Sequence, residues 1–243
     1  MRANVAVVLV GAAVLAASVS GQQGGHLNPM VDLLSARKAM FGLGVPTVGR
    51  GGGNRGGAPG GAPGAVAPAV PPAPATPPKT PLELAKDAAA HPEADFFFTA
   101  MMERNIDAGS ATLTALQDAL SEVGNVTRTV TRRLVMPVNS KAPNISRPDM
   151  PADPASYVAN ISRQLNAGVS TFSFVEVDTA EELRLGIAAM RFKSKGGTRP
   201  EDVGSAPKYW GLSEAEYRSR ADVWPLNPEG ELVAWAIIES PEG

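Results

Sequence analysis

Apolar segments of strand length alternate with helix-forming segments along most of this chain, and this alternation limits the possible folds more than any other feature. Each strand-like segment is a nearly continuous apolar run, which is typical of strands covered on both faces. The expected strands are residues 39–45, 94–102, 133–138, 171–177 and 232–238. The helix-forming segments between them lie at about residues 80–90, 110–124, 153–168 and 178–190. The pattern predicts an α/β fold with a mainly parallel sheet.

Capping residues mark where several of these helices are expected to begin. Ser213 and Glu216 have the spacing of a capping box, in which each side chain accepts a backbone N–H of the other residue. Ser110 and Asp178 are expected to cap helices through a single side-chain oxygen. A further short helix, residues 28–38, is expected before the first strand.

A low-complexity segment interrupts the regular pattern. Residues 49–79 consist mostly of Gly, Pro and Ala and contain no aromatic residue, Leu or Ile. Such a segment cannot bury enough apolar surface to offset the entropy lost on ordering, so we expect a disordered surface insert. Docking of its Pro-rich end in a polyproline conformation is the less favoured alternative. The insert separates a first helix and strand, residues 22–48, from a longer α/β region, residues 80–243.

Residues 1–21 have the layout of a secretory signal peptide. The positive charge of Arg2 precedes an uncharged apolar run over residues 5–17, and small residues follow up to Gly21. The run is shorter than the roughly 20 apolar residues that cross a membrane. Cleavage and export to the periplasm or the exterior are therefore favoured over an uncleaved anchor, and no stable membrane span is expected after cleavage.

Charge and cysteine content argue against several classes of protein. The formal net charge is −2, whereas nucleic-acid-binding domains usually carry a strong basic excess. The chain contains 0 Cys, which excludes a disulfide scaffold, thiol catalysis and thiolate metal ligands. The sequence also lacks a P-loop, a dinucleotide-binding glycine motif and the HExxH zinc motif.

Polar residues that follow the expected strands are the candidate functional residues, because catalytic groups of parallel α/β folds lie at the carboxyl ends of strands. Glu239 follows the last apolar run and suits Mg²⁺ or Mn²⁺, which prefer oxygen ligands. Asp178 is favoured as a helix cap. The remaining candidates, which are solvated loop residues in the alternative interpretation, are Glu103, Arg104, Asn105, Asp107, residues 139–141 and Glu176.

A basic, loop-like segment occupies residues 191–211. Four Lys or Arg residues fall within its first nine positions. Such a cluster either draws an anionic substrate toward the site or forms a solvated surface loop, and the sequence favours neither interpretation. The two histidines, His26 and His91, are weak candidates for catalysis because of their positions, and surface locations are favoured for both.

Four stretches in the second half of the chain resemble the HpcH/HpaI aldolase and citrate lyase family. They are ISRQLNAGVSTFSFVEVDTAEELRLGIAAMRFKSKGGTRP (161–200), YWGLSEAEY (209–217), DVWPLNPEGEL (222–232) and IIESPEG (237–243). The opening NPMVDLLSARKAMFGLG (28–44) also fits that family, so the resemblance covers about residues 28–48 and 80–243. It implies a partial (β/α)8 TIM barrel, with about five of the eight βα units in this chain.

The resemblance also implies a reaction and a cofactor. Members of the family make or break a carbon–carbon bond beside a 2-oxo acid, such as a 4-hydroxy-2-oxo acid, and release pyruvate or a related oxo acid. A divalent metal, Mg²⁺ or Mn²⁺, polarises the oxo acid and stabilises the enolate. A Glu after strand five holds the metal and is matched by Glu239, whereas the Asp after strand six has no counterpart here. Full-length members are expected to form homo-oligomers.

Two further positions depart from the pattern of the family. Its Glu-His pair after strand two is Glu103-Arg104 in this chain, and an Arg stays protonated and cannot act as a general base at neutral pH. Met136 stands where the family has an Arg that binds the oxo group. Glu103 and Asp107 are the nearest candidates for a replacement base.

Three functions remain open at this point. The first is a metal-dependent lyase, favoured by Glu239 and by the dense matches over residues 161–243. The second is an exported barrel relative or truncated fragment without activity, favoured by the missing His and Arg. The third is an open α/β binding protein that is complete at 243 residues. Because one carboxylate rarely binds Mg²⁺ unaided and strand five would have an exposed edge, we expect a chain truncated after strand five.

Overall fold

The computed structural model describes residues 25–44, 79–91, 94–98, 100–102, 105–124, 135–141, 153–238 and 241. The expected signal peptide, residues 1–21, lies outside the described residues, as does all of the 49–79 insert except its last residue. Three of the residues singled out in the sequence also lie outside them, namely Glu103, Arg104 and Glu239.

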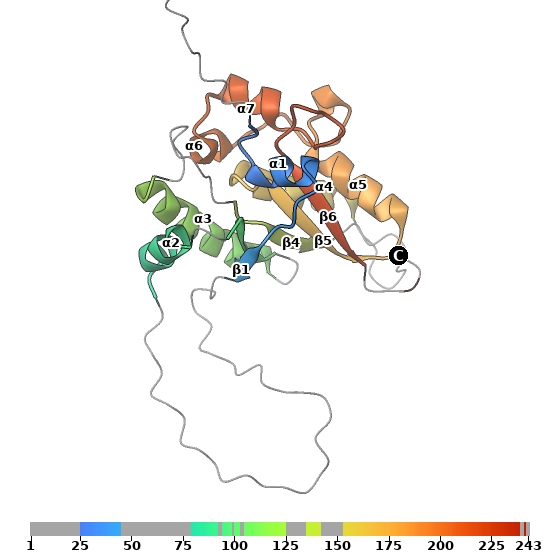
Figure 1. The fold of residues 1–243 in the computed structure, drawn as a ribbon. Helices are drawn as coiled ribbons and strands as arrows, with labels where there is room; N and C mark the ends of the chain where they lie inside the picture. The colour runs from blue at the N-terminus through green and yellow to red at the C-terminus, as the bar shows by residue number, and fades with distance from the viewer. Residues whose placement is uncertain are drawn as a thin grey trace, which may run out of the picture.

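The described strands pair in parallel and in the order of the chain (Figure 1). β1 (Gly42–Gly44) pairs with β2 (Phe96–Phe98), and a second sheet runs in the order β3 (Ala100–Met101), β4 (Val138–Lys141), β5 (Thr171–Val177) and β6 (Val233–Ile238). A parallel bridge between Phe96 and Val135 joins the start of β2 to the segment that leads into β4. The predicted α/β fold with a mainly parallel sheet is therefore confirmed. Among the described strands the order never reverses, so they show no switch point of a doubly wound sheet.

Helices alternate with the strands, and all the described α-helices except the first pack into the main core on one face of the sheet. The described helices are α1 (Pro29–Ser35), α2 (Pro81–Ala89), α3 (Ile106–Glu122), α4 (Pro154–Asn166), α5 (Ala180–Met190), α6 (Ala206–Trp210) and α7 (Glu214–Arg220), with a 3₁₀ turn at Lys193–Lys195. The main core joins this helical layer to the sheet and includes Leu113, Leu165, Phe172 and Phe174. In the described part of the chain, no helix is both long and apolar enough to cross a membrane.

The first helix and the first strand are shorter than predicted, and β1 is exposed where a buried strand was expected. Three further predicted boundaries are wrong for local reasons. The third strand begins at Val138 instead of ending there, and Pro137 before it has no N–H to donate to a ladder. α3 begins one turn earlier than predicted, because Asn105 caps it by accepting the Ala108 N–H at 3.0 Å. Thr179 caps α5 in place of Asp178, through a capping box with Glu182.

The sheet is strongly curved, and aromatic rings meet across its concave face. The ring centroids of Phe96 on β2 and Trp235 on β6 are 5.8 Å apart, although β4 and β5 lie between these strands. Three strand spacings in a flat sheet would separate them by about 14 Å. Phe96 also covers Gly42 of β1, where a Cβ would lie 2.1 Å from the ring. The sheet must therefore bend toward its concave face.

α1 fills the concave face near the amino-terminal ends of the strands. Met30 and Val31 of α1 form a second core cluster with Val135 and Val233, and the face includes the rings of Phe96 and Trp235. Figure 1 shows α1 in front of the strands, on the face opposite the main core. This end of a parallel α/β sheet usually serves stability.

A buried polar cluster fixes α1 to the sheet. Asn28, the N-cap of α1, donates its backbone N–H to Glu231 Oε2 at 2.9 Å and its Nδ2 to Thr171 Oγ1 at 3.1 Å. Glu231 is fully buried and also accepts a hydrogen bond from Arg220 Nη1 at 2.9 Å. Because a buried carboxylate is costly without partners, this cluster ties the first helix to β5 and β6.

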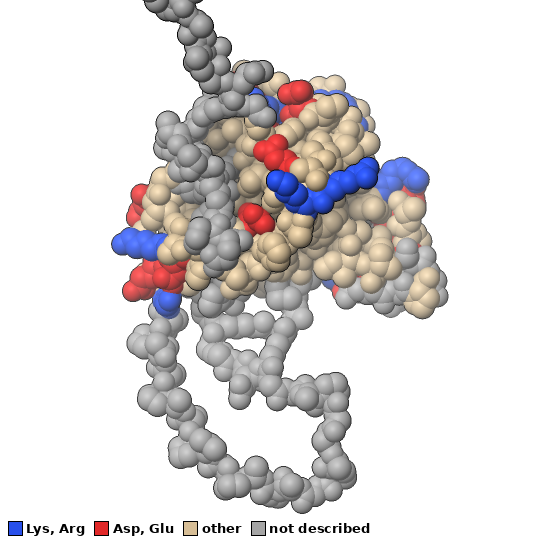
Figure 2. Space-filling view, in the orientation of Figure 1, with Lys and Arg blue, Asp and Glu red and all other residues tan. Residues whose placement is uncertain are grey.

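Surface charges are mixed in sign. On the face shown in Figure 2, acidic and basic side chains lie interspersed among uncharged ones. Some form ion pairs between elements: Lys208 of α6 lies 3.0 Å from Asp118 of α3, and Arg218 of α7 lies 3.2 Å from Glu201. These pairs are exposed, so each contributes at most about 1 kcal/mol to stability.

Glu231→Gln is expected to lower the free energy of unfolding by about 2 kcal/mol, because the amide loses the charge that Arg220 pairs with and one of the two acceptor oxygens. Glu229→Gln is the matched control: it makes the same change two residues away, at an exposed side chain, and should change stability by less than about 0.5 kcal/mol. Urea unfolding of both variants measures the difference. Equal losses in the two variants would contradict an anchoring role for Glu231.

Candidate functional site

The carboxyl ends of β4 and β5 bring two of the predicted polar residues together. Lys141 is the last residue of β4, and Glu176 is the second-last residue of β5. Their side chains form an ion pair, with Lys141 Nζ 3.1 Å from Glu176 Oε2. Both side chains are partly exposed, so the pair remains accessible to a ligand.

An unusual backbone conformation places Glu176 at this edge. Its φ is +55°, in the left-handed region, which costs a residue with a Cβ about 1–2 kcal/mol. The pairing of β5 with β6 shifts register between Phe174 and Val177, around Glu176. Irregularities of this kind re-aim side chains near functional sites.

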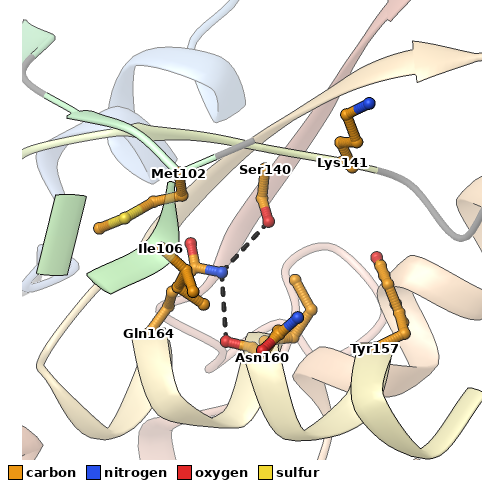
Figure 3. A pocket seen from close by; sticks show the side chains of 8 residues that line it. Met102, Ile106, Ser140, Lys141, Tyr157, Asn160 and Gln164 are labelled. Carbon is orange, nitrogen blue, oxygen red and sulfur yellow. Dashed lines mark hydrogen bonds between the residues drawn. The ribbon is translucent and has the colours of Figure 1, made fainter. Parts of the chain in front are cut away.

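A cavity of about 260 Å³ lies beside Lys141, between the sheet and two helices (Figure 3). Met102 and Ile106 line it from the side of β3 and α3, and Ser140 and Lys141 from β4. The residues of α4 that complete the wall are Tyr157, Asn160, Ile161 and Gln164. The cavity thus combines apolar side chains with a cation, two hydroxyl groups and two amides.

Hydrogen bonds fix one wall of the cavity. Gln164 is only 1% exposed, and its Nε2 donates to Ser140 Oγ and to the Asn160 carbonyl, each at 3.2 Å. These bonds are drawn in Figure 3. Burial raises the pKa of the Tyr157 phenol well above its ordinary value, so this hydroxyl stays protonated and remains a donor. Sequence reasoning missed Tyr157 and Gln164, because they lie in the first and last turns of a helix and carry no motif.

Of the two predicted catalytic residues, Glu103 and Asp107, the structure describes only Asp107. Asp107 lies in the first turn of α3 with its side chain 80% exposed, and its Oδ1 is 2.5 Å from Arg163 Nη1 of α4. It is not among the described residues that line the cavity. Met136, at the position expected to bind the oxo group, is buried in the main core. Glu103 and Glu239 lie outside the described residues.

The described residues do not fit a divalent metal. They contain no group of three or more His, Cys, Asp or Glu side chains that could hold an ion. The carboxylate that does lie at the strand ends, Glu176, is paired with the cation of Lys141. The expected ligand Glu239 is the next residue after β6 in the sequence.

Two residues of the basic segment at residues 191–211, Arg191 and Arg199, are packed into the fold. Arg191 donates to both carboxylate oxygens of Asp222, at 2.6 and 3.3 Å. Arg199 is fully buried, with its guanidinium 4.1 Å from the centre of the Phe192 ring. The segment follows α5, contains the 3₁₀ turn and α6, and ends before α7. These two arginines therefore belong neither to a solvated loop nor to a surface that attracts an anionic substrate.

Comparison with known proteins assigns no family. No protein-family model matches the chain, and no curated protein matches it. The resemblance to the HpcH/HpaI family therefore depends on the quoted sequence stretches alone, and function has to be argued from the residues and their geometry.

Glu176→Gly and Glu176→Ala separate backbone strain from side-chain chemistry, because both variants remove the carboxylate. We expect the Gly variant to be more stable than the Ala variant by about 1 kcal/mol, since glycine adopts a positive φ without penalty. Urea unfolding measures the difference. If the Ala variant is equally or more stable, residue 176 does not adopt this conformation.

Proposed function

We propose that the described strands are consecutive strands of a (β/α)8 barrel of the HpcH/HpaI type, and that the protein is a metal-dependent lyase acting on a 2-oxo acid. One observation carries this proposal. The strands are parallel and pair in the order of the chain, and the rings of Phe96 and Trp235 lie close enough together to indicate a curved sheet. In a barrel, each strand pairs with the next and the sheet curves continuously.

The place of Glu239 supports the same proposal. With β2 and β3 counted as one strand, β6 is the fifth strand, and it ends at Ile238. Glu239 therefore follows the fifth strand, at the position where the resembling family has its metal-binding glutamate. Mg²⁺ or Mn²⁺ would supply a Lewis acid for the oxo group when bound. The described residues alone do not complete a site for the ion.

Glu103 is the preferred candidate for the general base. Of the two carboxylates proposed for this role, Asp107 is paired with Arg163 on an exposed surface between α3 and α4. Such a position does not favour proton transfer in a closed site. Glu103 follows β3 and Met102 in the sequence, near the carboxyl edge where barrel enzymes carry catalytic groups. Residues 1–21 would act as the signal peptide that directs export of this enzyme.

A second candidate function is an exported barrel relative without catalytic activity. Arg104 replaces the expected His, and Met136 replaces the expected Arg. The burial of Met136 in the main core favours this alternative, because the side chain offers no donor to an oxo group.

Assay of pyruvate release from a 4-hydroxy-2-oxo acid, with Mg²⁺ or Mn²⁺, tests the proposal. We expect activity that chelation abolishes and that Glu239→Gln lowers by roughly 100-fold, because the carboxylate ligand is lost. Glu229→Gln, an exposed carboxylate away from the strand ends, is the control and should leave activity unchanged. Activity that is unchanged both by chelation of the metal and by Glu239→Gln would refute the metal mechanism. A folded protein without activity in either metal would support the non-catalytic alternative.

A further inference from the structure

We propose that the cavity between β4, α3 and α4 binds a small aliphatic carboxylic acid, with its carboxylate at Lys141 and its carbon chain against the apolar wall. The inference is independent of the proposed lyase, because among the described residues neither the cavity wall nor its hydrogen bonds involve a candidate metal ligand.

The size of the cavity limits the ligand. Its volume of about 260 Å³ is many times the roughly 10–15 Å³ that one water requires. It falls just below the about 300–1,000 Å³ that is usual for pockets of drug-sized ligands. The cavity is therefore large enough for a small organic molecule such as a short-chain acid.

The two sides of the cavity differ in chemistry. Met102 and Ile161 are buried apolar side chains, and Ile106 is half-buried beside them. Ser140, Lys141 and the exposed Asn160 form the polar side. A ligand with one charged end and a short hydrocarbon chain satisfies both sides, because burial of its methylene groups adds about 0.8 kcal/mol each.

The polar side is rich in donors. Ser140 Oγ accepts a hydrogen bond from Gln164, which leaves the Ser140 hydroxyl proton free to donate outward. The Tyr157 hydroxyl is buried beside α5, 3.2 Å from the position that a Cβ on Gly186 would take, so it does not face the ligand. The Lys141 ammonium, the Ser140 hydroxyl and the amide of the exposed Asn160 remain as donors on this side, which a carboxylate accepts and a cation does not.

Glu176 sets the affinity by competing for Lys141. Its carboxylate already lies 3.1 Å from Lys141 Nζ, so a bound acid must share or displace this partner. Removing the charge of Lys141 and removing the charge of Glu176 should therefore change binding in opposite directions.

Titration of the full chain with butyrate and with neutral butyramide, followed by amide NMR shifts, tests the proposal. We expect saturable binding of butyrate and at least about tenfold weaker binding of butyramide. Lys141→Gln should weaken butyrate binding by about tenfold, Lys141→Arg should retain it, and Glu176→Gln should tighten it several-fold. Lys193→Gln, an exposed lysine outside the cavity, is the matched control.

Three results would overturn the proposal. They are equal affinity for butyrate and butyramide, butyrate binding unaffected by Lys141→Gln, and no saturable butyrate binding up to about 0.1 M. Melting curves establish that each variant is folded, and the comparison of the two ligands on the unsubstituted chain decides the matter if Lys141→Gln fails to fold. Glu239→Gln should leave butyrate binding unchanged, which separates this site from the proposed metal site.

Discussion

The contact between Phe96 and Trp235 is the constraint on which the rest of the structure depends. Two rings on strands three spacings apart meet only if the sheet bends. The bend creates a concave face that α1 fills with Met30 and Val31, and a convex face that the larger helices cover. The ion pair at the carboxyl ends has a separate origin: β4 and β5 are neighbouring strands, and Lys141 lies opposite Val175, the residue before Glu176.

The fold could be predicted well where one local signal dominates. The apolar run at residues 171–177 matches β5 in full, and Asp153 begins α4 as its cap. The errors occur where the sequence offers equal choices. Both Asp178 and Thr179 have a Glu three residues later, and only packing decides that Thr179 pairs with Glu182. The apolar run before β4 contains Pro137, which lacks the N–H that a regular ladder needs.

The candidate site could be predicted only in part. Residues at strand ends were identifiable from the sequence, and the structure does pair Lys141 with Glu176. The left-handed backbone at Glu176 and the cavity wall from α4 depend on tertiary packing, so no local pattern reports them. Arg199 shows the same limit: it belongs to a basic stretch in the sequence, but the aromatic ring of Phe192 covers its guanidinium. Charge patterning describes the composition of a segment and does not report its burial.

We propose a barrel-type enzyme whose site lies at the carboxyl ends of its strands, with a separate small cavity beside it. The barrel in this proposal requires the curved sheet. The most direct test is therefore a nuclear Overhauser measurement on the chain with selectively labelled Phe, Tyr and Trp. Cross-peaks between the ring protons of Phe96 and Trp235 are expected, because the ring centroids are 5.8 Å apart. The absence of these cross-peaks, while those between the neighbouring rings of Trp210 and Tyr217 are observed, would contradict the account.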